Sequence, residues 1–317
     1  MNAHAHKLPD LVEANHVLGD RAELDRLLEQ HGYLFFRGVL DVDAVANARS
    51  RVIATLADMG VVDRGQTRAV WNGADLSAFP DKVEPLYKAG IWQELVACPA
   101  IGAFYEKVMG RPIEWIPLSG FRTTPPAACA PEDPFSSRHQ DGFMNGDLPY
   151  ITCWVPLDTI SRETGGLALA DGFNHHGYFH DVTAAPRFPI PRGAIPDTAW
   201  RSAYYRPGDT VMFDHRIPHT GLPNRSPEFR LSLDVRLMPA GDPLVPLVGE
   251  IVSVAPDAAV VDCGGEQRTV RFDEDTYFRA YSGTRLRFEE VLPFLAEGTE
   301  VMIGHRDGVA TMIKPVQ

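Results

Sequence analysis

The segment Ser137-Arg138-His139-Gln140-Asp141-Gly142 places an imidazole and a carboxylate two residues apart in a stretch that is expected to be extended. Side chains at positions i and i+2 of a strand point to the same face, so His139 and Asp141 are expected to converge on one point. A ferrous ion held by two histidines and one carboxylate keeps three positions open for other ligands. The segment therefore supplies two ligands of such a site, and a second histidine must come from elsewhere.

His219 is the favoured third ligand among the eleven histidines of the chain, and His215 is its near competitor. Arg230 follows His219 by eleven residues, in an expected strand over 229–237. Alternation places Arg230 and Ser232 on one face of that strand. A guanidinium beside a hydroxyl on an inward face is a receptor for a carboxylate. A metal with open positions near such a receptor indicates 2-oxoglutarate as a chelating co-substrate.

The sequence resembles the phytanoyl-CoA dioxygenase-like family of Fe(II)- and 2-oxoglutarate-dependent oxygenases. The resemblance covers roughly residues 20 to 240. The matching text is, in order, Gln30-His31-Gly32-Tyr33-Leu34-Phe35-Phe36-Arg37-Gly38-Val39-Leu40, His139-Gln140-Asp141, Trp154-Val155-Pro156-Leu157-Asp158, Gly165-Gly166-Leu167, Gly208-Asp209, His219, Asn224 and Arg230. It implies a double-stranded β-helix, or jelly roll, flanked by N-terminal helices, and an enzyme that uses Fe(II), 2-oxoglutarate and O2.

The resemblance also assigns roles to single residues. By role these are the iron ligands His139, Asp141 and His219, the 2-oxoglutarate anchor Arg230 with Ser232, and Trp154 and Arg122 as further residues of the co-substrate pocket. The implied reaction oxidises, and most simply hydroxylates, a small organic molecule with release of succinate and CO2. Desaturation, cyclisation or epimerisation at the same site stays open. Halogenation is disfavoured, because halogenating relatives replace the carboxylate ligand with a small residue.

The substrate side of the site is less well defined. Phe143 and Met144 leave the metal segment directly and are expected to line the substrate cavity. The stretch 171–176 departs from the Pro-Gly-Ser-His text of relatives, and Asn174 within it is expected at the substrate mouth. His175, His176 and His180 could form a second metal cluster, but such loop histidines are more often solvated.

Two other classes of function stay open. A cupin-like metal-binding or sensing protein without turnover would keep the His-Asp-His text but would not need Arg230 and Ser232. A hydrolytic metalloenzyme would need a general base near the metal and would be indifferent to oxygen.

Hydrophobic periodicity organises the rest of the chain. Helices are predicted over 20–31, from Asp41 to about Leu56, and over 84–97 and 99–109, with a buried strand over 33–40; extended runs follow at 113–118, 150–157, 166–170, 209–214 and 229–237. The stretch 239–243 is read as a linker. Residues 1–240 are thus predicted to form a mainly β dioxygenase domain with flanking helices. Five short strands predict a small accessory β-barrel-like module over 246–317, of OB-like or SH3-like size.

Composition limits the class of protein. A net charge of −12 over 317 residues disfavours nucleic acid as a partner, and no apolar run approaches the length of a membrane span. The partner expected is a small-molecule substrate, and a homo-oligomer stays open. The four cysteines, Cys98, Cys129, Cys153 and Cys263, are scattered and predict free thiols in a reducing cytoplasm.

Overall fold

The helical N-terminal part of the chain follows its local sequence signals. A computed structural model describes residues 8–127, 133–184, 187–279 and 285–316. Helix α1 (Arg21–His31) begins where the Asp20 carboxylate accepts a hydrogen bond from the Glu23 amide, and it ends at Gly32 with φ +78°. After strand β1 (Tyr33–Phe36), the Asp41 side chain caps α2 (Val42–Asp58). These predicted elements are confirmed, but the strand predicted over 33–40 ends at Phe36.

The single helix predicted over 84–97 is wrong. The structure has two short helices there, α3 (Glu84–Lys88) and α4 (Ile91–Val96). Gly90 separates them with φ +69°, a left-handed conformation that interrupts the helix and that glycine adopts without a steric cost. Helix α5 (Pro99–Met109) follows as predicted.

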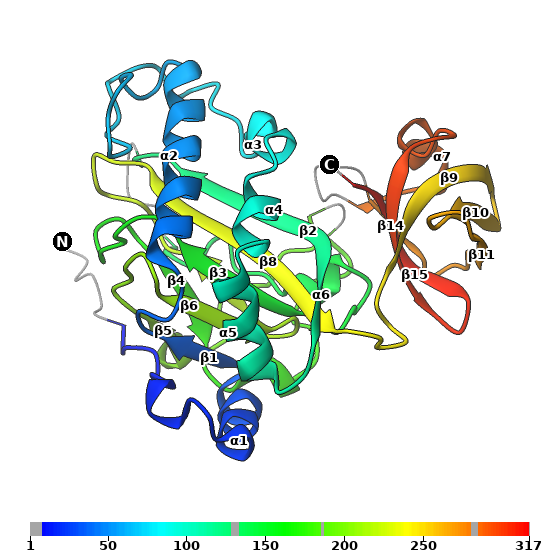
Figure 1. Cartoon of the computed structure of the whole chain (residues 1–317), viewed down its shortest axis with the longest axis horizontal. Coiled ribbons are helices and arrows are strands. Elements are labelled where there is room, and N and C mark those ends of the chain that lie inside the picture. The colour runs from blue at the N-terminus through cyan, green and yellow to red at the C-terminus, as the bar shows by residue number, and fades with distance from the viewer. Residues whose placement is uncertain (1–7, 128–132, 185–186, 280–284, 317) are drawn as a thin grey trace.

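A five-stranded antiparallel sheet in the order β1-β6-β3-β8-β2 forms the large layer of the fold. Its remaining strands are β2 (Ile113–Thr124), β3 (Ile151–Pro156), β6 (Thr210–Asp214) and β8 (Arg230–Pro239). Leu231, Leu233 and Val235 pack in one core cluster with residues of α2 and α5. Figure 1 shows these helices in front of the sheet. The alternate side chains of β8 therefore face the inside of the fold.

A three-stranded sheet in the order β5-β4-β7 forms the second layer. Its strands are β4 (Leu167–Ala170), β5 (Trp200–Ser202) and β7 (His219–Gly221), and the last two were not predicted because each has only three residues. Residues of both sheets share a buried cluster that includes Phe35, Trp154, Phe213, Leu167 and Leu169. The chain is thus mainly β with flanking helices, as predicted.

The C-terminal residues form a separate seven-stranded sheet in the order β11-β10-β9-β14-β15-β12-β13, in which β11 also pairs with β15. Its elements are β9 (Leu247–Ala255), β10 (Ala258–Asp262), β11 (Gln267–Arg271), β12 (Tyr277–Arg279), β13 (Arg285–Leu286), β14 (Glu300–Arg306), β15 (Val309–Pro315) and the short helix α7 (Phe288–Val291). The five predicted strands are present. Strands β12 and β13 were missed, because three and two residues are too few for alternation to show.

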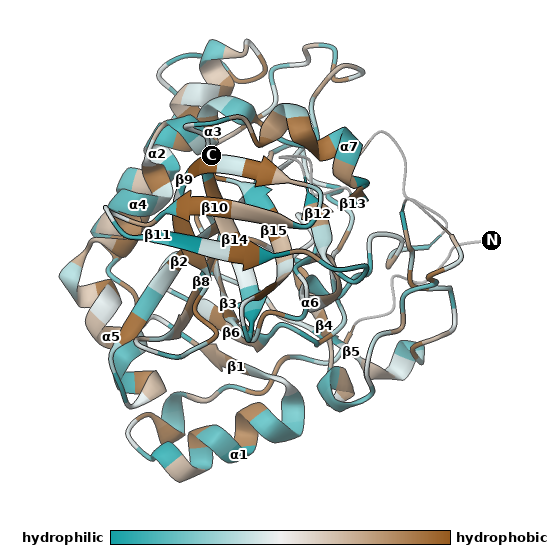
Figure 2. Ribbon diagram, turned by 90° about the vertical axis from the view of Figure 1, so that its right-hand side faces the viewer, coloured by the Kyte–Doolittle hydropathy of each residue, from teal (hydrophilic) through white to brown (hydrophobic). Residues whose placement is uncertain are grey.

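This C-terminal sheet packs against the first part of the chain rather than standing apart. Tyr277, Met302 and Met312 share a buried cluster with residues of the first part of the chain, namely Ile116, Leu118, Leu148, Tyr150 and Met238. A Cβ at Gly146 would lie 2.6 Å from the Thr311 carbonyl oxygen, so the two backbones touch. Figure 2 shows β9, β10, β14 and β15 in front of β2, β8 and β3.

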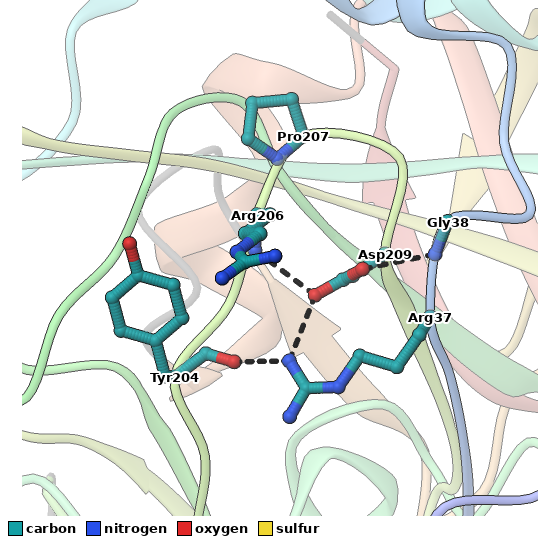
Figure 3. Close-up of a pocket in the computed structure, with 6 residues that line it drawn as sticks. All are labelled: Arg37, Gly38, Tyr204, Arg206, Pro207 and Asp209. Atoms are coloured by element: carbon teal, nitrogen blue, oxygen red, sulfur yellow. Dashed lines mark hydrogen bonds and ion pairs between the residues drawn. The ribbon is translucent and has the colours of Figure 1, made fainter.

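A surface pocket of about 370 Å³ at the beginning of β6 is part of the scaffold. Asp209 accepts hydrogen bonds there from the backbone amides of Gly38 and Arg206 and from Arg37, at 2.9 to 3.1 Å (Figure 3). A buried carboxylate satisfied by three donors ties the end of β1 to the turn before β6. The metal-ligand candidate His219 follows the opposite end of β6.

Two further expectations bear on the chain's surroundings. Cys98, Cys153 and Cys263 are free thiols, and Cys129 lies outside the described residues. Across the described ranges, none of the helices is both long and apolar enough to cross a membrane.

Candidate metal centre

The structure brings His139, Asp141 and His219 together. One donor atom from each lies within 4.8 Å of the others. Asp141 Oδ1 is 3.5 Å from His139 Nε2 and 3.7 Å from His219 Nε2. The two histidines form an antiparallel bridge in which each backbone amide donates to the other's carbonyl at 2.9 Å. The third ligand thus reaches the site by pairing directly with the first.

The local geometry of the His139-Gln140-Asp141 segment differs from the predicted strand. Gln140 is extended, with φ −121° and ψ 121°, but Asp141 is already the first residue of the short helix α6 (Asp141–Met144). The Gly142 amide donates to the His215 carbonyl at 2.7 Å, and a Cβ at Gly142 would collide with the Tyr178 hydroxyl. A turn of the chain, and not strand alternation, therefore directs Asp141 toward the histidines.

Both imidazoles are prepared to bind a metal through Nε2. Nδ1 of His139 lies 2.8 Å from the Ser137 carbonyl, and Nδ1 of His219 lies 3.1 Å from the Ile217 carbonyl. A carbonyl can only accept, so Nδ1 carries the proton and the Nε2 lone pair faces Asp141. Burial, together with the neighbouring His139, lowers the pKa of His219 to about 3, so this ring is neutral near pH 7.

Arg236 is a residue of the site that sequence reasoning missed. Its Nη2 donates to Asp141 Oδ2 at 2.7 Å, and Thr152 Oγ1 donates to the same oxygen at 3.2 Å. Burial alone would raise the pKa of Asp141, but the charge of Arg236 and the two histidines hold that pKa well below its usual range. Asp141 therefore stays ionised, with Oδ2 engaged and Oδ1 directed at the histidines. Continuing the alternation of Arg230 and Ser232 along β8 would have found Arg236.

Arg230 and Ser232 lie on the inner face of β8, as the alternation predicts. The Arg230 guanidinium donates to Thr124 Oγ1 at 2.8 Å and to the Leu222 carbonyl at 2.7 Å. A Cβ at Gly221 would lie 2.5 Å from Arg230 Nη2, so glycine leaves room for the guanidinium. Ser232 Oγ is buried and has no hydrogen-bond partner among the residues that the structure describes. A guanidinium beside an unpartnered buried hydroxyl fits the distal carboxylate of 2-oxoglutarate.

Arg122 and Trp154 lie on strands that flank β8. Arg122 is opposite Ser232 in the register and donates to Asp234 Oδ2 at 2.9 Å. Its side chain keeps 45% of its surface accessible although it is on the inner face, so it borders an open space. Trp154 is opposite Asp234, and its ring lies 4.7 Å from that of Tyr205 in the buried cluster between the sheets.

The three residues expected at the substrate do not come together. Phe143 stacks on His180 with ring centroids 4.1 Å apart, and Met144 Sδ lies 3.5 Å from the Tyr277 hydroxyl of β12. Asn174 instead lies against the end of α1, where its amide donates to the Glu29 carbonyl at 3.4 Å. Asn174 was linked to the substrate by its place in an unusual loop, and that loop packs on a helix.

Three other histidines make contacts within the scaffold. His180 Nε2 accepts a hydrogen bond from the Gln140 amide at 3.1 Å, and His175 Nε2 lies 2.7 Å from the Glu29 carbonyl. His215 contacts Asp147 at 3.2 Å. Over the described ranges, His139, Asp141 and His219 form the one group with three candidate ligands in reach of one ion.

Comparison with known proteins agrees with this geometry. Residues 126–232 match the family model of phytanoyl-CoA dioxygenase (PhyH). The 1-deoxypentalenic acid 11-beta-hydroxylase of Streptomyces arenae is 30% identical over 253 residues, which are 73% of this chain and 86% of the relative. The chain belongs to the phytanoyl-CoA dioxygenase family. The hydroxylase of the same description from Streptomyces exfoliatus is 31% identical over 251 residues, 74% of this chain and 86% of that protein.

Among solved structures, the non-heme alpha-ketoglutarate-dependent epimerase SnoN from nogalamycin biosynthesis is similar in fold. It is 22% identical, with 70% of this chain and 85% of SnoN covered and a TM-score of 0.50. The identity to the two hydroxylases confirms the family resemblance seen in the sequence. This phytanoyl-CoA dioxygenase-family member is a non-haem iron, 2-oxoglutarate-dependent oxygenase.

Proposed function

We propose that this oxygenase hydroxylates a small organic acid, with O2 and 2-oxoglutarate as co-substrates and with release of succinate and CO2. The observation that carries the proposal is the convergence of His139, Asp141 and His219 beside the Arg230–Ser232 receptor. Hydroxylation and the acidic substrate are supported by two relatives that are named as hydroxylases of a carboxylic acid.

His139, Asp141 and His219 would hold the iron, which when bound supplies the oxygen chemistry of the reaction. With three protein donors, the ion would keep positions free for co-substrate and substrate. Arg236 keeps Asp141 ionised and orients it through Oδ2. Arg230 and Ser232 bind the distal carboxylate of 2-oxoglutarate and so fix the direction in which its keto-acid end points. Burial lowers the pKa of Arg230 to about 10, so its guanidinium stays charged near pH 7.

The two-layer β architecture is proposed to be the double-stranded β-helix of this family, with Trp154 and Arg122 as further residues of the co-substrate pocket. Residues 1–240 would form the oxygenase domain. Residues 246–317 would form an accessory, barrel-like module. This is supported by the additional pairing of β11 with β15, which curls the sheet because three strands separate these two in the main strand order. The partner is a small molecule rather than nucleic acid, as the net charge of −12 supports.

The test uses anaerobic protein with Fe(II) and 2-oxoglutarate. A weak metal-to-ligand charge-transfer band in the visible is expected, and succinate should form when O2 is admitted with an acceptable substrate. His139→Ala should abolish both. Arg230→Ala should weaken 2-oxoglutarate binding while Fe(II) binding persists, and Arg225→Ala, an exposed arginine nearby, is the matched control. A metallated wild-type protein without the band, or with turnover that is indifferent to O2, would favour a metal-binding or hydrolytic protein.

A further inference from the structure

Asp234 lies between two arginines on the inner face of the large sheet. It is buried on β8, in the same alternating row as Arg230, Ser232 and Arg236. Its Oδ2 accepts hydrogen bonds from Nε and Nη2 of Arg122, at 3.2 and 2.9 Å. The same oxygen lies 3.6 Å from Nη2 of Arg236. One carboxylate oxygen of Asp234 therefore faces the guanidinium groups of both arginines.

The alternation of charges continues from Arg236 to the metal ligand. Nη2 of Arg236 lies between two carboxylates, because it donates to Asp141 Oδ2 at 2.7 Å and is 3.6 Å from Asp234 Oδ2. Burial alone would lower the pKa of Arg236, but the charges of Asp141 and Asp234 raise it. We call the four residues that lead in this way to the metal centre the charge row, namely Arg122, Asp234, Arg236 and Asp141.

The far end of the charge row borders the co-substrate pocket. Arg122 is opposite Ser232, whose hydroxyl is buried without a hydrogen-bond partner among the described residues. The Arg122 side chain keeps 45% of its surface accessible, and its Nη1 has no hydrogen-bond partner across the described ranges. Along β8, Asp234 therefore stands between the Arg230–Ser232 receptor and the arginine that holds the metal ligand.

Gly120 provides the space for the Asp234 carboxylate. It is opposite Asp234 in the pairing of β2 with β8, just beyond an irregularity that begins at Ile116. A Cβ at Gly120 would lie 2.6 Å from Asp234 Oδ2 and 3.5 Å from Nη2 of Arg122. A glycine inside a strand often marks the close approach of another group. Any larger residue at this position would displace the carboxylate from the two arginines.

We propose that Asp234 is a positioning residue that couples Arg122 of the co-substrate pocket to the metal ligand Asp141. Asp234 fixes the direction of the Arg122 guanidinium through two hydrogen bonds. Arg122 in turn occupies the Asp234 carboxylate, which then competes less with Asp141 for Nη2 of Arg236. The inference rests on the proposed function and deepens it, because it links metal affinity to the residues that receive the co-substrate.

Two variants disturb Asp234 in different ways. Gly120→Ala keeps every charge and displaces the carboxylate, whereas Asp234→Asn keeps the shape of the side chain and removes its charge. Titration calorimetry measures Co(II) binding to the full-length protein without co-substrate. It then measures binding of N-oxalylglycine, which has the two carboxylates of 2-oxoglutarate, to the Co(II)-loaded protein. Both variants should weaken each affinity about fivefold or more, which corresponds to about 1 kcal/mol.

The expected directions separate positioning from other roles of Asp234. Removing a negative charge beside an anionic ligand would by itself tighten binding of N-oxalylglycine, so weaker binding by Asp234→Asn indicates misplaced arginines. Arg122→Met should weaken Co(II) binding about fivefold, although no hydrogen bond joins Arg122 to a metal ligand among the described residues. The visible absorption of bound Co(II) should also shift in the variants, which a loss of fold stability alone would not cause.

A matched control is Gly102→Ala on α5, where an added Cβ meets nothing within 4 Å. It should leave both affinities and the Co(II) spectrum unchanged. If Asp234→Asn fails to fold, Gly120→Ala and Arg122→Met carry the test. An unchanged Co(II) affinity and spectrum in the folded variants, or tighter binding of N-oxalylglycine by Asp234→Asn, overturns the positioning role but leaves the proposed function standing. A wild type that binds neither Co(II) nor N-oxalylglycine overturns both.

Discussion

Replacing Arg236 with Met should weaken metal binding although Arg236 is not expected to contact the metal. The substitution keeps an unbranched apolar stem but removes the guanidinium, whose Nη2 donates to Asp141 Oδ2 at 2.7 Å. Thr152 remains as a neutral donor at 3.2 Å. Loss of a charge-assisted hydrogen bond to a buried carboxylate costs about 2 kcal/mol, which corresponds to roughly a 30-fold loss of affinity.

The pH dependence of metal binding should change as well. In the wild type the pKa of Asp141 is depressed, so its carboxylate is ionised at every pH above the usual pKa of an aspartate. Without Arg236, burial becomes the dominant influence on Asp141 and raises its pKa. Metal affinity of Arg236→Met should therefore fall as the pH is lowered from 8 to 6, over a range in which ionisation of Asp141 does not limit the wild type.

The assay is anaerobic calorimetry with Fe(II), repeated with Co(II) as an ion that tolerates air. Arg236→Lys should recover part of the affinity, because a point charge replaces the guanidinium but cannot reproduce its geometry. Arg216→Met, which removes a partner of Asp147 instead, is the control. Equal affinity and equal pH dependence in wild type and Arg236→Met would refute the assignment of Arg236 as the residue that positions Asp141.

Three further changes probe the co-substrate pocket and the half-buried Lys82. Gly221→Ala should displace the Arg230 guanidinium and raise the Kd for 2-oxoglutarate at least about tenfold in a charge-transfer titration, with Fe(II) affinity unchanged. Ser232→Ala should weaken 2-oxoglutarate binding without lowering the Tm of the protein free of co-substrate, because the hydroxyl has no hydrogen-bond partner among the described residues. Burial and the charge of Arg279 lower the pKa of Lys82 to about 8. Between pH 8 and the ordinary pKa of lysine, the amine is therefore protonated in the unfolded state and largely neutral in the folded state. The free energy of unfolding in urea should rise with pH over that window, and Lys82→Met should flatten the rise.

Local periodicity and local capping residues were sufficient to predict several features of the fold. Asp20 and Gly32 mark the ends of α1 because capping and a left-handed C-terminal residue are local requirements. Alternation along β8 is equally local, so it placed Arg230 and Ser232 on one face before their surroundings were known. The resemblance to the phytanoyl-CoA dioxygenase family supplied the order of the metal ligands along the chain.

Which of these residues come into contact depends on long-range packing. Asp141 reaches the histidines through the turn into α6, and Arg236 joins it from 95 residues away. The pairing of Arg279 with Asn145 across 134 residues likewise depends on how the C-terminal sheet packs on the first part of the chain. Such contacts are fixed by strand order and by the packing of buried faces, which no short stretch of sequence encodes, and they determine where the charges around the metal lie.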